Sequence, residues 1–436
     1  MKQINQINQK FDAIVVGAGP AGTTAALHIA KGGAKVLLIE RGKFVGAKNS
    51  FGGTLEYSPL LQQLIPDFWN TIPWERFINK RIFSTLHSDS HFSVSYDSSH
   101  FRSPPYPGCT LYRSVFDSWY ANKALKAGVT LLTETTVTQI TDNGVILNSK
   151  QEVFANMIVA ADGVLSKLSQ SIGLRPEPQV EECSLGLKLF YQLDEDIINE
   201  RFNLQNREGV CQFFLGNSAD ILGGGFLYTQ LQGLSVGIVH SLSSLNKNYK
   251  RVNIHQLLEE FVSQSPLKWG LKHAKLMEYS AHIIPKISSW KKYPIHHNRF
   301  LVVGDAAGFC YNTGLHIEGM NLAIESGYLA AQTVLYAHKK GDFSKKTLND
   351  YVERIKESSI GSNFRTNERL GNFINDDIVI KSYPRLIDEM VNRLLFKKNL
   401  YQKKESIFFV FLDSIRKYLG IGKFFREIIR IIKSII

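Results

Sequence analysis

The hydrophobic positions of the chain follow two patterns, and each predicts a different kind of sheet. Short apolar runs rich in β-branched residues occur at Ala13–Val16, Val36–Ile39, Ile158–Ala161 and Phe300–Val303. Such runs are typical of strands buried on both faces of a parallel sheet. Residues 80–104 and 176–285 instead alternate apolar and polar side chains, as in Leu187–Leu193 and Leu234–His240. This period of two predicts a mostly antiparallel sheet with one covered face.

The first apolar run leads into a glycine-rich turn with the spacing G-x-G-x-x-G, and a helix is predicted over Thr23–Lys31. In such turns the first glycine permits a tight bend, and the second lets a pyrophosphate approach the backbone. The third glycine allows the helix and strand to pack closely, and the helix N-terminus favours anionic phosphates. The candidate cofactor-binding residues of this turn are Gly17, Ala18, Gly19, Pro20, Ala21 and Gly22.

The second apolar run ends in Glu40, eighteen residues after Gly22, and Arg41 follows. A carboxylate at this point can accept hydrogen bonds from an adenosine ribose, and it would repel a 2′-phosphate. We therefore include Glu40 and Arg41 among the candidate cofactor-binding residues.

The last apolar run decides between cofactors. It ends at Gly304–Asp305, and a helix-like stretch follows at Gly319, Met320 and Asn321. A dehydrogenase that uses only a nicotinamide has no need of a second aspartate-bearing strand end so far along the chain. A dinucleotide with a ribitol does, because a carboxylate there can hold a ribitol hydroxyl. The helix N-terminus beside it can stabilise negative charge on a reduced flavin, so the pattern predicts FAD.

Further candidates lie between these two segments. Arg113 and Asp117 fall at i and i+4 of a predicted helix. Arg113 can hold a phosphate or flavin edge, or simply pair with Asp117. Val137 ends a strand whose backbone can meet adenine. Asp162–Gly163 ends another buried strand, where the aspartate either lies near the dinucleotide or caps a turn.

The net charge of the chain limits the classes of partner that it is expected to bind. The chain has 436 residues, with 51 Lys and Arg against 39 Asp and Glu, which gives a formal net charge of +12. Such a balance suits nucleic acid, anionic lipid or an acidic protein. No nucleic-acid-binding motif is visible, so we expect no nucleic acid partner.

The cysteines and the N-terminus point to a cytoplasmic protein. The four cysteines form no C-x-x-C pair, so we expect no metal or iron–sulfur site within the chain. Residues 1–10 are polar and lack the apolar core of a signal peptide. No apolar run approaches the length needed to span a bilayer.

The last fourteen residues, Lys423–Ile436, are both basic and apolar. Set on a helix, their isoleucines and phenylalanines fill an arc of roughly 160°. This fits an interfacial helix drawn to anionic lipid, and it also fits a helix docked on the protein's own core or on a partner.

Together these features predict an α/β protein with α+β insertions. A Rossmann-type FAD-binding domain is expected to be discontinuous, comprising residues 1–79, 105–175 and 286–345. An antiparallel-sheet substrate or acceptor domain comprises residues 80–104 and 176–285. Residues 346–436 form a helical C-terminal region with the basic amphipathic tail.

The motifs as a set resemble the FixC branch of the electron-transfer-flavoprotein:quinone oxidoreductase family, within the wider group of geranylgeranyl reductases and aromatic hydroxylases. The loop Gly46–Gly53 resembles the family's loop after the ribose-binding strand, and it adds Lys48, Asn49, Gly52 and Gly53 to the candidate cofactor-binding residues. The other matching segments are Arg113–Asp117, Glu195–Leu204, Gly223–Tyr228, Gly304–Phe309 and Gly319–Ile324.

The resemblance implies an FAD enzyme that takes electrons from an electron-transfer flavoprotein and passes them toward quinone. It also implies that a separate small ferredoxin-like protein supplies the iron–sulfur cluster. Electron transfer through a flavin depends on proximity and potential, so no catalytic residue is named.

Two other classes of function stay open. One is an FAD-dependent reductase or tailoring oxidase acting on an apolar, isoprenoid-like substrate. The other is a non-catalytic flavoprotein subunit that only binds partners. For the first reading we expect a cytoplasmic protein that contacts the inner face of the cell membrane through its C-terminal helix.

Overall fold

The computed structural model describes most of the chain. The described stretches are residues 10–48, 52–87, 90–216, 221–287, 289–312, 317–365, 382–396, 405–422, 424–426 and 429.

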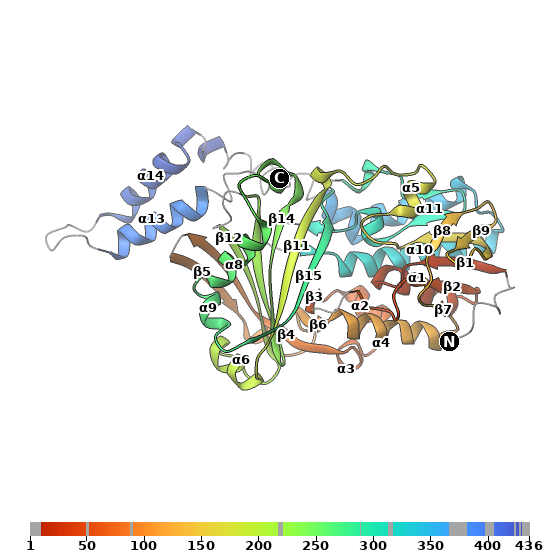
Figure 1. Ribbon diagram of the computed structural model, residues 1–436, viewed down its shortest axis with the longest axis horizontal. Helices are drawn as coiled ribbons and strands as arrows, with labels where there is room; N and C mark the ends of the chain where they lie inside the picture. Colours follow the sequence, from red (N-terminus) through yellow and green to blue (C-terminus); the bar gives the residue numbers. More distant parts are fainter. Residues whose placement is uncertain are drawn as a thin grey trace.

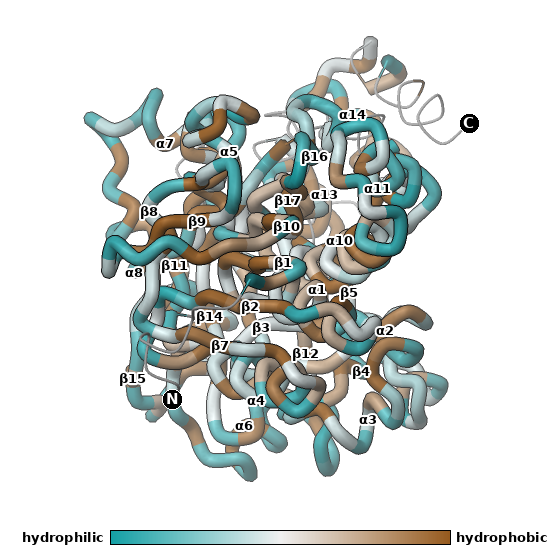
Figure 2. The backbone as a smooth tube through the Cα atoms, turned by 90° about the vertical axis from the view of Figure 1, so that its right-hand side faces the viewer, coloured by the Kyte–Doolittle hydropathy of each residue, from teal (hydrophilic) through white to brown (hydrophobic). Residues whose placement is uncertain are grey.

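The cofactor-binding half is built on a mainly parallel sheet with the order β16-β17-β10-β1-β2-β7. Its strands are β1 (Phe11–Val16), β2 (Val36–Ile39), β7 (Thr130–Leu132), β10 (Glu152–Ala160), β16 (His296–His297) and β17 (Phe300–Val302). Within this order all neighbouring pairs are parallel except β16 with β17. Strands β8 (Val137–Ile140) and β9 (Gly144–Leu147) complete the eight-stranded sheet as an antiparallel hairpin, with β9 antiparallel to β10, so Val137 begins a strand rather than ending one. The apolar runs predicted as buried strands are β1, β2, β10 and β17, and Figure 2 shows them as a hydrophobic layer inside the molecule.

Helices that contact one another pack beside this sheet. They include α1 (Pro20–Lys31), α4 (Arg113–Lys126), α10 (Met320–Lys340) and α11 (Lys345–Glu357). Helix α1 begins three residues before the predicted start because Pro20, with its fixed φ, suits the first helical position. Helices α1 and α10 lie side by side although three hundred residues separate them (Figure 1). Their close approach needs Gly327, since a Cβ there would overlap the Ala21 carbonyl oxygen.

The second half is a nine-stranded sheet with the order β15-β11-β14-β13-β12-β4-β6-β3, and β5 pairs with β4. The strands are β3 (Gly52–Glu56), β4 (Trp74–His87), β5 (Ser90–Asp97), β6 (Gly108–Tyr112), β11 (Cys183–Gln192), β12 (Glu208–Gly216), β13 (Gly223–Gln230), β14 (Gly233–Ser241) and β15 (Lys275–Pro285). Pairing is antiparallel except between β12 and β4. The α/β class with an inserted, mostly antiparallel sheet is thereby confirmed.

The sheet pairing bears on the domain boundaries. Strands β3 and β6 lie within ranges assigned to the FAD-binding domain, yet they pair into the nine-stranded sheet. The chain therefore passes between the two halves more often than the predicted domain boundaries imply. The division into three units stays a prediction.

One face of the nine-stranded sheet packs against helices and the other faces the cofactor-binding half (Figure 1). The covering helices are α6 (Glu195–Phe202), α8 (Ile254–Ser263) and α9 (Leu267–Gly270). Leu257, Leu258 and Phe261 of α8 bury their side chains in a core with Leu187 and Val236 of the sheet. This fixes which face of each strand is free to line a site.

The described C-terminal residues form a helical hairpin of α13 (Tyr383–Leu395) and α14 (Ile407–Tyr418). Helix α13 packs on β4 and β5, and the hairpin extends away from the cofactor-binding half (Figure 1). Most of the predicted tail helix, Lys423–Ile436, lies outside the described residues. Among the described helices, none combines the length and apolar character needed to cross a membrane.

Candidate functional site

A cavity of about 1210 Å³ lies between the two halves of the molecule. It is larger than a typical small-molecule site, which occupies about 300–1,000 Å³. Sixteen of the predicted cofactor-binding residues line it: Gly17, Gly19, Pro20, Ala21, Glu40, Arg41, Lys48, Gly53, Arg113, Val137, Asp162, Gly163, Gly304, Asp305, Gly319 and Met320.

Four predicted residues do not line the cavity. Ala18 and Gly22 are buried behind the glycine turn, and the amide of Asn321 donates to the Glu56 carbonyl oxygen at 2.7 Å. A side chain at Gly52 would overlap Gln230, so this glycine serves packing within the sheet. Asn49 lies outside the described residues.

The three glycines of the turn have the different structural roles that their spacing predicts. Gly17 has φ +101°, and a Cβ there would overlap the Ala161 carbonyl oxygen. A Cβ at Gly22 would overlap the carbonyl oxygen of Gly17. A Cβ at Gly19 would meet no atom within 4 Å, so the backbone there faces open space at the start of α1. The N-terminus of α1 is thus accessible to an anionic group.

Glu40 stands at the carboxyl end of β2 and is held by backbone amides. The Ala18 amide donates to its Oε2 at 3.0 Å, and the Gly42 amide donates to its Oε1 at 2.7 Å. The carboxylate therefore braces the glycine turn while it lines the cavity. The sequence predicted the position but not this bracing role.

Asp162 follows β10 on the same side of the cavity. Its Oδ2 accepts a hydrogen bond from the Leu168 amide at 3.0 Å, which caps the short helix α5 (Lys167–Ser171). Its Oδ1 is buried and has no hydrogen-bond partner, and burial raises the pKa of the carboxyl group. A buried polar atom without a partner on a cavity wall is a position where a ligand donor is expected.

The two dinucleotide segments meet at this wall. A Cβ built on Gly304, which has φ +60°, would lie 2.9 Å from the Cβ of Ala21. Asp305 follows at the edge of the cavity, and a Cβ built on Gly319 would lie 3.8 Å from its Oδ1. The start of α10 therefore faces the same space as the start of α1.

Arg113 begins α4 and makes a two-point contact with Asp117. Its Nε lies 3.1 Å from Oδ1 and its Nη2 lies 2.9 Å from Oδ2. Burial works against the guanidinium charge, but Asp117 and Asp305 raise its pKa above the ordinary value. The predicted pairing of Arg113 with Asp117 is thus observed, and Arg113 also lines the cavity beside Gly53.

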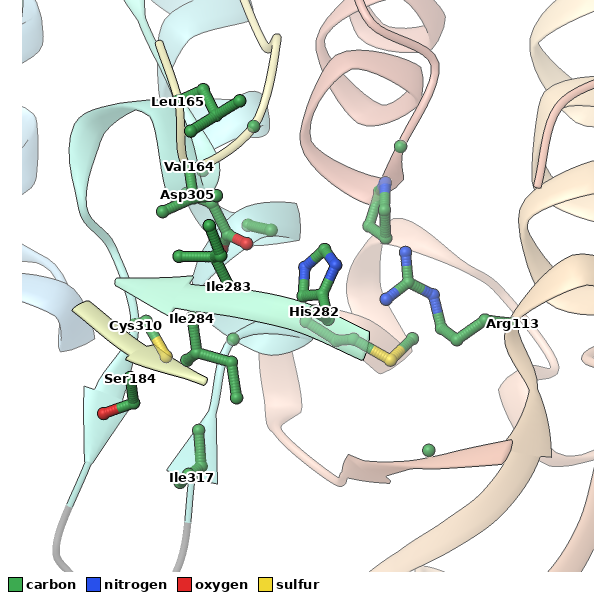
Figure 3. Close-up of a pocket in the computed structure, with 18 of the residues that line it drawn as sticks. Arg113, Val164, Leu165, Ser184, His282, Ile283, Ile284, Asp305, Cys310 and Ile317 are labelled. Atoms are coloured by element: carbon green, nitrogen blue, oxygen red, sulfur yellow. The ribbon is translucent and has the colours of Figure 1, made fainter. Parts of the chain in front are cut away.

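His282 of β15 lies between Arg113 and Asp305 in the view of Figure 3. Burial lowers the pKa of His282, with Asp305 opposing this effect. Burial raises the pKa of Asp305, and His282 and Arg113 oppose that rise. The three groups form a buried charged cluster whose protonation states depend on one another.

Lys188 of β11 is a cavity residue that the sequence reading missed. Its Nζ donates to the Gly52 carbonyl oxygen at 2.7 Å, and burial lowers its pKa to about 8. The alternation Leu187-Lys188-Leu189 was available in the sequence and puts the lysine opposite the core-facing leucines. In most half-buried strands that opposite face is solvated, so the pattern alone gives no reason to expect a cavity.

The cavity also has an apolar arm that leaves the charged cluster along the nine-stranded sheet. The arm is lined by Phe213 and Leu215 of β12, Phe226 of β13 and Val239 of β14. Tyr383, the first residue of α13, also lines the cavity. None of these residues belongs to a local motif.

The residues present fit a bound dinucleotide with a flavin. Open backbone at Gly19, the unpartnered Oδ1 of Asp162 and the positions of Glu40 and Asp305 all face one continuous space. Two helix N-termini at α1 and α10 add favourable partial charge for anionic groups.

Comparison with known proteins gives consistent results. A family described as "FAD dependent oxidoreductase" matches residues 12–166. The FixC protein of Escherichia coli K12 is 36% identical over 381 residues, covering 86% of this chain and 88% of that protein. The probable electron transfer flavoprotein-quinone oxidoreductase YdiS of the same strain is 33% identical over 392 residues, covering 89% and 91%.

Among solved structures, a geranylgeranyl bacteriochlorophyll reductase-like protein from Thermoplasma acidophilum is similar in fold. It has a TM-score of 0.71 and 22% sequence identity, with 94% of this chain and 96% of that chain covered. At this level of identity the likeness concerns the arrangement of the two sheets and their helices.

Proposed function

The chain belongs to the FixC family of FAD-dependent oxidoreductases, and we propose that it receives electrons from an electron-transfer flavoprotein and passes them toward a quinone. FAD is the cofactor, and when bound it supplies the redox chemistry by taking up and releasing electrons. The chain's own residues bind and orient the cofactor, exclude water and set the local field.

One observation carries the proposal. One cavity is lined by the glycine turn, by the charged cluster, and by the apolar side chains of the arm together with Tyr383. A polar head with an apolar tail, such as a quinone, fits this change in character along the cavity. The name of the relative YdiS, a probable electron transfer flavoprotein-quinone oxidoreductase, supports the same class of reaction.

The predicted residues divide into three tasks. We assign the phosphate end of FAD to the turn Gly17–Gly22 and the ribose to Glu40, with Arg41, Lys48 and Val137 nearby. We assign the ribitol and ring end to Gly53, Arg113, Asp305, Gly319 and Met320. The unpartnered Oδ1 of Asp162 accepts a hydrogen bond from the bound cofactor. The charges of the Arg113–His282–Asp305 cluster affect the reduction potential of the flavin.

We further propose a small ferredoxin-like protein as the partner that carries the next redox centre. The four cysteines of this chain are all buried, on or beside different strands. Copurification of a ferredoxin-like protein with the tagged chain from its native host would support this partner, and its exclusion from the active complex would contradict it.

Contact with the inner face of a membrane is part of the same proposal. Residues 382–436 contain 12 Lys and Arg against 5 Asp and Glu, so an eighth of the chain holds more than half of its net charge. In the same region Leu395, Phe396, Ile407 and Phe408 expose apolar side chains. Basic and aromatic residues together suit an anionic bilayer surface. The test is sedimentation with vesicles containing phosphatidylglycerol, and unchanged binding after removal of residues 405–436 would refute it.

The decisive experiment is anaerobic. The FAD-loaded protein is mixed with a reduced electron-transfer flavoprotein, and a ubiquinone analogue is then added while the flavin absorbance is followed. We expect bleaching by the donor and recovery on addition of the quinone. Failure of both steps, with bleaching by NADPH instead, would favour the second candidate function.

That second candidate is an FAD-dependent reductase or tailoring oxidase acting on an isoprenoid-like substrate. The apolar arm favours it, because its walls suit an apolar chain of either kind. Conversion of a prenyl substrate by the reduced protein, detected by mass spectrometry, would establish this activity.

A further inference from the structure

A line of apolar side chains continues from the arm of the cavity to the outer edge of the nine-stranded sheet. Directly paired residues on neighbouring strands point to the same face. Lys188 pairs with Gly237, Gly237 with Phe226, and Phe226 with Phe213. Phe213 then pairs with Phe83, and Phe83 with Val94. The row thus crosses β11, β14, β13, β12, β4 and β5, about 24 Å at about 4.8 Å per strand.

The row changes steadily from buried to exposed. Phe213 and Phe226 are 7% and 8% exposed, Phe83 is 38% exposed and Val94 is 55% exposed. The rings of Phe83 and Phe213 stack with centroids 5.8 Å apart, so the buried and exposed parts are in contact. Phe92 and Tyr96 flank Val94 on the same face of β5 and are also exposed.

The row also changes in polarity. Its inner end holds the Lys188 ammonium group, 5.9 Å from the centre of the Phe226 ring. From Phe226 outward each member is apolar, and Gly237 contributes no side chain because the Phe226 ring occupies the space above it. A ligand with a polar head inside and an apolar chain directed outward matches this order.

Helix α13 spans the point where the row leaves the cavity. Tyr383 lines the main cavity, and Pro384 lines a second cavity of about 170 Å³ with Thr85 and Phe92 of the sheet. Asp388 anchors the helix, accepting a hydrogen bond from Ser90 and lying 3.5 Å from His87 Nδ1. Helix α13 therefore packs beside the outer part of the row, and Figure 1 shows it next to β5.

We propose that the row Phe226–Phe213–Phe83–Val94 binds the isoprenoid tail of the acceptor and guides it from the cavity to the surface at β5. This inference rests on the proposed function, since it takes the acceptor to be an apolar quinone. Exposed apolar residues that continue a buried cavity wall mark a binding surface rather than scattered surface residues. A protein partner would leave the inner, buried half of the row unexplained.

The experiment compares three probes by isothermal titration to the FAD-loaded protein: ubiquinone-0, which has no tail, ubiquinone-2, and farnesol, which is a tail alone. We expect ubiquinone-2 to bind at least ~10-fold more tightly than ubiquinone-0, because each buried methylene group adds to affinity. In the double variant Phe83→Ser/Val94→Ser this ratio should fall toward one. Farnesol binding should weaken with it.

The matched control is Leu276→Ser/Tyr279→Ser on β15, at the opposite edge of the same sheet. These side chains are as exposed as Phe83 and Val94, and the control should keep the wild-type ratio. Val94→Asp alone is a second variant that leaves the Phe83–Phe213 stacking intact, and it should also reduce the ratio.

The outcomes separate this inference from the proposed function. If both quinones oxidise the flavin and the double variant keeps the wild-type ratio, the tail-binding row is wrong and the proposed function stands. If neither quinone oxidises the flavin but farnesol binding depends on Phe83 and Val94, the row is right and the proposed acceptor is wrong. If the double variant loses vesicle binding but keeps the wild-type ratio of the two quinone affinities, the β5 face contacts a lipid surface and the inference is wrong.

Discussion

The two ends of the cavity are built in different ways. The cofactor end uses backbone and short, contiguous segments: one turn supplies Gly17, Gly19 and Gly22, and one strand end supplies Gly304 and Asp305. The apolar arm uses single side chains from separate strands, such as Phe213, Phe226 and Val239. The first end is specified by local chain geometry, and the second by the register of a sheet.

This difference suggests how such a protein can change its acceptor while keeping its cofactor. A substitution in the glycine turn alters the backbone path and therefore both fold and binding. A substitution in the arm alters one wall of a space that FAD does not need. Variants that affect only one end of the cavity test whether the two ends are independent.

Blocking the arm should have the largest effect on the rate of flavin oxidation. Val239→Phe adds a ring to the wall that β14 contributes to the arm. It should slow flavin oxidation by a ubiquinone more than ~10-fold, which is about 1.4 kcal/mol. The FAD content should stay at the wild-type level. Anaerobic stopped-flow absorbance measures the rate, and Val239→Ala is the matched control that leaves the arm open. Equal slowing by both variants would show that the arm does not admit the acceptor.

The glycine turn offers the opposite test. Gly22→Ala places a methyl group against the Gly17 carbonyl, so it should lower the free energy of unfolding by about 1–3 kcal/mol even without FAD. Gly19→Ala meets open space and has φ −68°. It should keep the unfolding free energy within about 0.5 kcal/mol while weakening FAD binding. Urea unfolding and FAD titration distinguish the two, and a destabilised Gly19→Ala protein with normal FAD affinity would reverse the assignment.

Lys188 lies where the two ends meet, and it should make stability depend on pH. Its pKa is lowered from 10.5 to about 8 in the folded protein. Between these values the unfolded chain binds more protons, so the free energy of unfolding should rise with pH, by at most about 1.4 kcal/mol per unit. Below pH 8 this contribution is constant. Lys188→Met should remove the rise, whereas Lys167→Met, at an exposed position, should retain it. Urea unfolding at pH 7.5, 8.5 and 9.5 checks the slope, and a slope that persists in Lys188→Met would assign it to other groups.

The smallest effect is expected in the C-terminal hairpin. Arg393 of α13 pairs with Glu405 and with Asp413 of α14, the latter at 2.6 Å. Because these pairs lie at the surface and are partly exposed to solvent, Arg393→Met should change the global free energy of unfolding by less than about 1 kcal/mol. Amide hydrogen exchange should nevertheless accelerate in α14 and not in β1 or β10. Acceleration in both regions would mean that the hairpin and the parallel sheet unfold as one unit.

The cofactor end could be predicted from the sequence because its determinants are close together along the chain. The turn after β1, the acidic residue after β2 and the Gly–Asp pair after β17 each depend on a few consecutive residues. Even there, the bracing of the turn by Glu40 could not be predicted, since it depends on the approach of Ala18 and Gly42 to one carboxylate. The side chain of Asn321 likewise binds the β3 backbone rather than facing the cavity.

The apolar arm could not be predicted, and the reason is register. Phe213 and Phe226 meet only because β12 and β13 pair in one register, and Val239 joins them from β14. The alternation of apolar and polar residues predicts where strands occur. It does not predict which residues of neighbouring strands lie opposite each other. Lys188 was missed for the same reason, because a polar residue in an alternating strand usually faces solvent.

We propose that one continuous cavity holds FAD and admits an apolar acceptor to it. The most direct measurement follows the absorbance of the anaerobically reduced, FAD-loaded protein after addition of one equivalent of ubiquinone-2. We expect full return of the oxidised flavin spectrum, at a rate that Val239→Phe lowers and Val239→Ala preserves. A purified protein that cannot hold FAD, or a flavin that stays reduced in the presence of the quinone, would contradict it.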